Sequence, residues 1–214
     1  MPEPISIRTL PFPNWRSKRE VKHIWESFED VISERDPVQL VDAGANVGTF
    51  THYLREHWAS TEIHAFEPVK VTFDQLRTNV GDLEGVYLHE VGLYQENTIK
   101  EIGLYPVRRG HHNYGRMTVF HKDIEVTKVQ MVHAGEYFKK YNIQPEVMKV
   151  DIEGCELLFL QAVKEQLDNL KVLHIEINPT FEDHKKIEPY IIDVLGMAVF
   201  DSRELTTTYH RNAD

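Results

Sequence analysis

The chain has 214 residues, 41% of them hydrophobic, and a formal net charge of −10 at pH 7. This length suits one α/β domain with a sizeable core, so we expect residues 1–214 to form a single domain. The negative charge makes nucleic acid an unfavoured partner, because phosphates require clustered lysine and arginine. No apolar run approaches the roughly 18 residues of a membrane span, which predicts no transmembrane helix.

The cysteine content and the first residues indicate the cellular compartment in which the protein is expected. Cys155 is the single cysteine, which excludes an internal disulfide framework and fits a reducing environment. The opening residues, Met-Pro-Glu-Pro, lack the basic and apolar regions of a secretory signal. We therefore expect a cytoplasmic protein. Whether it forms a homo-oligomer stays open.

The first predicted element is an amphipathic helix. Within residues 17–34, apolar side chains such as Val21, Trp25 and Phe28 recur at helical spacing between charged residues. Pro37 disfavours helix at the residue before it. Residues 1–37 are therefore predicted to be a helical extension that packs on a sheet or covers a cleft.

A strand, a glycine turn and a helix follow. Residues 38–41 form a mostly apolar run, residues 42–48 read Asp-Ala-Gly-Ala-Asn-Val-Gly, and a helical pattern covers 49–58. Glycines let a backbone approach a ligand closely, and a helix N-terminus presents unpaired N–H groups. The turn is therefore predicted to bind a nucleoside-containing cofactor. Its candidate binding residues are Asp42, Gly44, Asn46 and Gly48.

A second acid ends the next predicted strand, residues 62–66. Glu67 lies 23 residues after Gly44, close to the roughly 20 expected when a second-strand carboxylate reaches a ribose. A carboxylate accepts hydrogen bonds from both ribose hydroxyls and repels a 2′-phosphate, which disfavours NADP. A helix is predicted near 69–80 and a third strand over 86–91. The end of that strand predicts that Glu90 and Gly92 lie near an adenine.

Residues 93–133 break the alternation of strands and helices. Residues 99–105 and 128–132 are predicted to be strands of an inserted hairpin or meander. Between them, a polar loop with His111 and His112 is predicted to lie over the site. A neutral imidazole there could accept a proton from a hydroxyl, so His112 is a catalytic candidate.

The rest of the chain completes a sheet. We expect an α/β fold with a Rossmann-like, seven-stranded mixed sheet, helices on both faces and an antiparallel last strand. The remaining predicted elements are a helix near 134–141, a strand at 147–151, a helix after Gly154, a strand at 172–177, a helix within 179–195, and a hairpin of 197–200 with 205–209.

Three carboxylates lie within six residues at the end of the strand predicted at 147–151: Asp151, Glu153 and Glu156. Such acids repel one another, so a fold rarely gathers them without a cation or ligand. The two motifs, D-x-G-A-N-x-G with F-E-P downstream and then K-x-D-x-E-G-x-E, occur in this order over roughly residues 38–180. In this respect the sequence resembles the FkbM family of methyltransferases that use S-adenosylmethionine (SAM).

The resemblance implies a class I methyltransferase fold, SAM as the cofactor with Asp42 facing its methionine end, and methyl transfer to a hydroxyl of a small molecule, sugar or glycan. Such transfer requires alignment of oxygen, methyl and sulfur, and removal of the hydroxyl proton. Asp151 is the first candidate to meet that hydroxyl, and it also counts among the cofactor-binding candidates. Glu153, which could orient the acceptor, and Lys149, which could pair with Asp151, are further catalytic candidates.

A divalent ion is an open alternative. Other small-molecule O-methyltransferases bind Mg²⁺ through acids at the ends of the fourth and fifth strands of the main sheet. In this chain these are the strands predicted at 147–151 and 172–177. Asp151, Glu176 and Asn178 would supply oxygen ligands of that kind to Mg²⁺ or Mn²⁺. Alternatively, Glu176 is an inward polar strand residue and Glu156 is a first-turn acid that the helix dipole stabilises.

Three other functions are alternatives to O-methylation. An NAD-linked dehydrogenase or epimerase would require a third glycine in the turn and a Tyr-x-x-x-Lys pair, whereas Tyr137 is followed four residues later by Tyr141. A catalytically degenerate SAM-binding module stays open. So does a methyltransferase acting on nucleic acid or protein.

Overall fold

The computed structural model describes residues 36–104, 117–118, 125–203 and 205–211. The predicted helix at 17–34 lies outside these residues, as do His111 and His112. The helical extension and the single-domain boundary therefore stay predictions. Among the described residues, no helix is long and apolar enough to cross a membrane.

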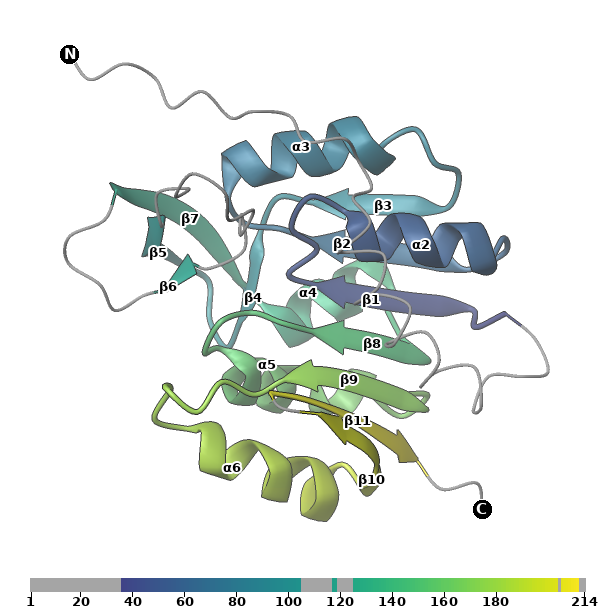
Figure 1. Ribbon diagram of the computed structural model, residues 1–214, viewed down its shortest axis with the longest axis vertical. Helices are drawn as coiled ribbons and strands as arrows, with labels where there is room; N and C mark the ends of the chain where they lie inside the picture. The colour runs from purple at the N-terminus through teal and green to yellow at the C-terminus, as the bar shows by residue number, and fades with distance from the viewer. Residues whose placement is uncertain (1–35, 105–116, 119–124, 204, 212–214) are drawn as a thin grey trace.

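The main sheet, as far as the structure describes the chain, has seven strands in the order β10-β11-β9-β8-β1-β2-β3 (Figure 1). Its central strands are parallel, and β11 runs antiparallel to both β9 and β10. The predicted mixed sheet with an antiparallel last strand is confirmed. The strands are β1 (Gln39–Ala43), β2 (Glu62–Phe66), β3 (Val86–His89), β8 (Val147–Val150), β9 (Val172–Glu176), β10 (Met197–Arg203) and β11 (Thr206–Arg211).

Helices cover both faces of this sheet, as its nearly continuous apolar strands require. Leu40 belongs to the same buried cluster as Phe50 and Leu54 of α2. Its neighbour Val41 points the other way and shares a cluster with Phe138 of α4. One face carries α2 (Thr49–His57) and α3 (Lys70–Val80). The other face carries α4 (Ala134–Tyr141), α5 (Glu156–Val163) and α6 (His184–Pro189). A π-helical turn (Tyr190–Val194) follows α6.

The inserted segment forms a second sheet that is larger than the predicted hairpin. Its strands are β4 (Gly92–Tyr94), β5 (Thr98–Leu104), β6 (Met117–Thr118) and β7 (Glu125–His133). The predicted antiparallel pairing is present between β5 and β7. The predicted third strand is too long, because β3 ends at His89 and the chain continues as β4 beside β7. Glycine permits this close pairing, since a Cβ on Gly92 would lie 2.4 Å from the Met131 sulfur.

The register of the main sheet determines where the functional motifs meet. Ala43, the last residue of β1, is paired with Phe66 of β2 on one side and with Val150 of β8 on the other. The residues that follow these three strand ends therefore emerge next to one another. Gly44 follows β1, Glu67 follows β2 and Asp151 follows β8.

Candidate active site

The turn after β1 is fixed against the ends of both neighbouring strands. The amides of Gly44 and Ala45 both donate to the Phe66 carbonyl oxygen, at 3.0 and 2.8 Å. Gly44 has a φ of +79°, and a Cβ there would lie 1.9 Å from the Asp151 carbonyl oxygen. Only glycine permits this backbone conformation together with this approach. The contact joins the glycine turn to the acidic loop after β8.

Glu67 lies under the turn and is 1% exposed. Its carboxylate accepts a hydrogen bond from the Asn46 amide at 3.1 Å and from the Val69 amide at 2.9 Å. Burial raises the pKa of Glu67 to about 7, although the two hydrogen bonds act in the opposite direction. The side-chain oxygen of Asn46, Oδ1, is also buried and has no hydrogen-bond partner among the described residues.

Asp42 and Lys149 form a charged pair beneath the turn. Asp42 is fully buried and its Oδ2 accepts a 2.7 Å hydrogen bond from the Thr51 hydroxyl of α2. The Lys149 ammonium lies 3.5 Å from Asp42 Oδ1 and donates to the Gly44 carbonyl oxygen at 2.7 Å. This pair thus connects β1, α2, β8 and the glycine turn.

The acidic loop after β8 presents one partly exposed carboxylate and buries another. The Asp151 side chain is 36% exposed, and its Oδ2 lies 3.7 Å from the Lys149 ammonium. Glu156 is 3% exposed and accepts from the amides of Ile152 and Gly154 at 3.0–3.3 Å. The Glu156 carboxylate therefore holds its own loop at the start of α5. This contact supports the structural alternative for Glu156.

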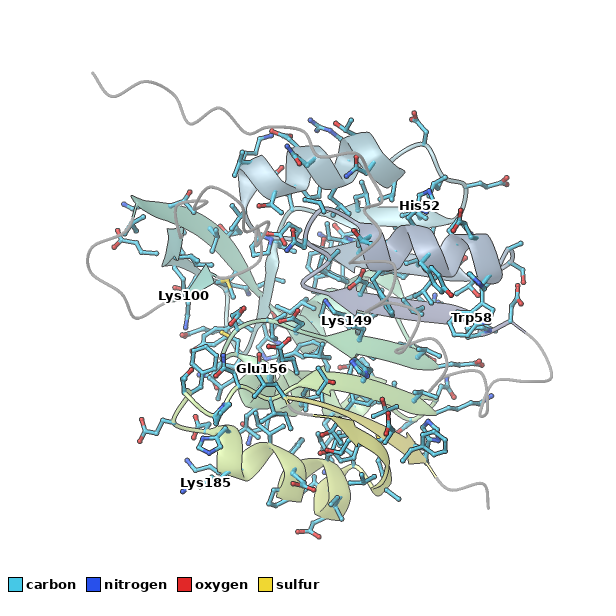
Figure 2. The ribbon with its side chains drawn as sticks, in the orientation of Figure 1. His52, Trp58, Lys100, Lys149, Glu156 and Lys185 are labelled. Atoms are coloured by element: carbon cyan, nitrogen blue, oxygen red, sulfur yellow. The ribbon has the colours of Figure 1, made fainter. Side chains whose placement is uncertain are left out.

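These segments line a cavity between the main sheet and the second sheet. The empty space within it is about 760 Å³, open solvent included. Figure 2 shows Lys149 in the main sheet and Lys100 on the second sheet. The main-sheet side of the lining includes Gly44, Asn46, Glu67, Asp151 and Glu153, and the inserted side includes Gly92, Lys100, Ile102 and Met131.

Four of the described residues that were predicted to be catalytic or to bind the cofactor do not line this cavity. Asp42 is buried below it and Lys149 lies beside Asp42, so both support the lining residues from behind. Gly48 has a φ of +90°, and a Cβ there would lie 2.8 Å from Leu76 of α3, so this glycine permits helix packing. Glu90 is exposed. Whether these four residues affect cofactor binding stays a prediction.

The predicted metal ligands do not form a supported metal site. Asn178 uses its side-chain oxygen to accept from the amide and the hydroxyl of Thr180, at 3.0 and 2.8 Å. Glu176 is half-buried, and its charge adds to those of Asp42 and Asp151, which raise the pKa of Lys149 against the effect of burial. In the part of the chain that the structure describes, no group of three or more His, Cys, Asp or Glu could hold a metal ion.

Apart from Gly92, sequence reasoning missed the inserted side of the cavity. Lys100, Ile102 and Met131 reach it only because β5 and β7 pair in the second sheet, and pairing between distant strands leaves no local sequence signal. Cys155 also lines the cavity, and burial raises the pKa of its thiol to about 11. The thiol is therefore protonated at neutral pH, which agrees with the absence of a predicted catalytic role.

Residues 42–201 match the family model of the methyltransferase FkbM domain, which covers most of the chain and both motifs of the cavity. The chain belongs to the FkbM methyltransferase family. This assignment confirms the resemblance that the two motifs carry, and it makes methyl transfer the activity of the domain.

Known proteins support the family and the fold. Methyltransferase 1 of Beauveria bassiana is 27% identical over 75% of this chain and 76% of its own length. Hexuronic acid methyltransferase AglP of Haloferax volcanii is 27% identical over 88% of this chain and 77% of its own length. The crystal structure of precorrin-6y C5,15-methyltransferase from Geobacter metallireducens has a TM-score of 0.53 at 11% identity, and the similarity covers 89% and 88% of the two chains. The predicted class I methyltransferase fold is confirmed.

Proposed function

We propose that this FkbM methyltransferase uses SAM to methylate a hydroxyl oxygen of a sugar or another small molecule. The observation that carries the proposal is the Asp151 carboxylate, which is partly exposed in the same cavity as Gly44, Asn46 and Glu67. A relative described as a hexuronic acid methyltransferase supports a saccharide acceptor. The net charge of −10 favours such an acceptor over nucleic acid.

The residues of the turn fit SAM. Asn46 Oδ1 is a buried acceptor without a partner, and buried polar atoms are normally paired, so it suits a donor on a ligand. Each Glu67 oxygen accepts one backbone N–H and has a second lone pair for a ribose hydroxyl. Gly44 exposes backbone at the cavity. When bound, SAM supplies an electrophilic methyl group on a sulfonium.

The protein must then orient the acceptor and remove its hydroxyl proton. The Lys149 ammonium lies beside Asp151 Oδ2, which leaves Oδ1 for the acceptor hydroxyl. A hydroxyl that donates to Oδ1 would pass its proton to this carboxylate as the oxygen attacks. Glu153 lines the same part of the cavity and would help to orient the acceptor. We assign no metal ion to these steps.

Calorimetric titration of the purified protein with SAM and with NAD tests the cofactor. We expect heat of binding with SAM and none with NAD. Incubation with SAM labelled in its methyl group should then transfer label to a sugar hydroxyl in a panel of saccharides. Binding of SAM with no transfer to sugar, RNA or protein would favour the degenerate binding module. Transfer to RNA or protein alone would replace the acceptor class.

Asn46 offers a sharper test of the turn. Asn46→Ala should weaken SAM binding by roughly tenfold, because it removes one hydrogen-bond acceptor for a charged or polar donor. Asn142→Ala is the matched control, since Asn142 has a similar φ of +53° but lies at the exposed end of α4. An equal SAM affinity in the two variants would contradict the assigned role of Asn46.

A further inference from the structure

Lys100 stands out among the described residues that line the cavity, because it alone carries a positive charge there. It lies on β5, and its ammonium is 3.6 Å from the centre of the Tyr94 ring. Tyr94 is 8% exposed, so the ring is a fixed support that holds the cation by a cation–π contact. The side chain is therefore positioned at the cavity rather than free in solvent.

No described carboxylate lies within ion-pair distance of Lys100, in contrast to Lys128 on β7, which lies 3.9 Å from Glu101. Cys155 is near Lys100, but burial raises the pKa of its thiol to about 11, so it supplies no negative charge at neutral pH. A half-buried cation with no counter-ion among the described residues has lost part of its hydration and gains from an anionic ligand.

The proposed cofactor does not explain this cation. SAM has one carboxylate, at its methionine end, but it also carries an ammonium and a sulfonium, so its net charge is positive and it attracts Lys100 less than an anionic ligand would. The residues assigned to SAM in the turn, Asn46 and Glu67 among them, follow strands of the main sheet, whereas Lys100 comes from the second sheet (Figure 2). Lys100 therefore suits an anionic acceptor better than it suits SAM.

We propose that Lys100 binds a carboxylate on the acceptor, so that the preferred acceptor is an acidic sugar. This inference rests on the proposed function, and it specifies the acceptor of the same cavity. A carboxylate fits better than a phosphate, because the described cavity residues offer a single ammonium and no arginine fork for a multiply charged group.

Matched pairs of acceptors test the proposal. Methyl transfer is measured to D-glucuronate and D-glucose, and to D-galacturonate and D-galactose, with D-glucose 6-phosphate as a further arm. We expect kcat/KM to be roughly tenfold or more higher for the acidic member of each pair, the scale of a charge-assisted contact. Lys100→Met keeps the length of the side chain and should remove this preference, mainly through KM. Lys128→Met removes a charge from the same sheet outside the cavity and should keep the preference.

The outcomes separate this inference from the proposed function. A preference for the neutral sugars, or an acidic preference that survives in Lys100→Met, overturns the role of Lys100. A higher kcat/KM for the sugar phosphate overturns the choice of carboxylate. If calorimetry shows SAM binding but neither member of any pair is methylated, the sugar acceptor fails together with this inference. If SAM does not bind, the proposed function itself fails.

Discussion

The ammonium of Lys149 donates a 2.7 Å hydrogen bond to the carbonyl oxygen of Gly44 and so links β8 to the glycine turn. The same ammonium lies near two carboxylates, those of Asp42 and Asp151. Burial acts to lower the pKa of Lys149, but the two carboxylates outweigh it and raise the pKa above its ordinary value. Lys149 is therefore a permanent cation that joins the two sequence motifs of the FkbM family.

Replacing this cation should destabilise the fold. Lys149→Met leaves the fully buried Asp42 without its partner, and breaking a buried pair costs about 3–5 kcal/mol. Urea denaturation of the free protein measures the loss. Lys171→Met is the control, because Lys171 pairs with Glu146 while 46% exposed and should cost about 1 kcal/mol or less. Equal losses in the two variants would show that the buried pair is not a stabilising contact.

Comparing Gly44 with Gly196 separates two effects of an added side chain: collision with the Asp151 carbonyl oxygen and strain of the backbone. Both have positive φ, +79° and +68°, so alanine is strained by about 1–2 kcal/mol at either position. Only at Gly44 would the new Cβ meet a neighbour, the Asp151 carbonyl oxygen. Gly44→Ala should therefore lose more unfolding free energy than Gly196→Ala and weaken SAM binding at least tenfold. Equal stability and unchanged affinity would contradict the contact.

The contact between Gly44 and the Asp151 carbonyl oxygen also changes what the sequence alone predicts for the turn. From the motif, a larger residue at position 44 is expected to block the ligand without unfolding the domain. In the structure its Cβ would first collide with protein backbone. For Asp42, the resemblance implies an acid that faces the methionine end of SAM. The structure shows this acid buried with Lys149 and Thr51, and its effect on cofactor binding stays a prediction.

The strands of the main sheet could be predicted because their signals are local. Apolar runs mark the strands, and the acids at 67 and 151 follow strand ends that the register brings together. The second sheet could be predicted only in part, since β4 pairs with β7 across nearly forty residues and its side chains alternate without a distinct pattern. Lys100 therefore became a candidate only once this pairing was known.

SAM binding should depend on pH through Glu67. Burial raises the pKa of this acid to about 7, so in the free protein its carboxylate is mostly protonated at pH 6 and mostly ionised at pH 8. If the ionised form binds the ribose, the dissociation constant should be about tenfold lower at pH 8 than at pH 6. The buried His64 and His89, whose pKa burial lowers to about 4, stay neutral over this range.

The control is Glu67→Ala, which removes this titration but keeps that of the SAM amino group. Calorimetry at pH 6, 7 and 8 should show weaker binding in the variant and a smaller pH dependence. Losing a charge-assisted hydrogen-bond acceptor costs about 1.5–3 kcal/mol of binding free energy, so the affinity for SAM at pH 8 should fall at least tenfold. The same pH profile in both proteins would exclude Glu67 as the titrating group.

Asp151 is the residue on which the proposed chemistry depends. Asp151→Asn preserves the shape of the side chain and the backbone contact with Gly44, but it removes the proton acceptor. Turnover should fall about 10²-fold or more, the usual scale of general-base catalysis, while the dissociation constant of SAM changes little. Transfer of labelled methyl groups and calorimetry measure the two quantities on the same preparation.

A role of Asp151 as a metal ligand predicts a different result, which EDTA tests. If Asp151 holds Mg²⁺ or Mn²⁺, EDTA should remove the activity of the unaltered enzyme and the ion should restore it. We expect EDTA to have no effect, because Asn178 already uses its side-chain oxygen within its own turn. Full resistance to EDTA together with an inactive Asp151→Asn variant would assign the carboxylate directly to the acceptor hydroxyl. Full activity of Asp151→Asn would instead make His111 or His112, which both lie outside the described residues, the next residue to replace.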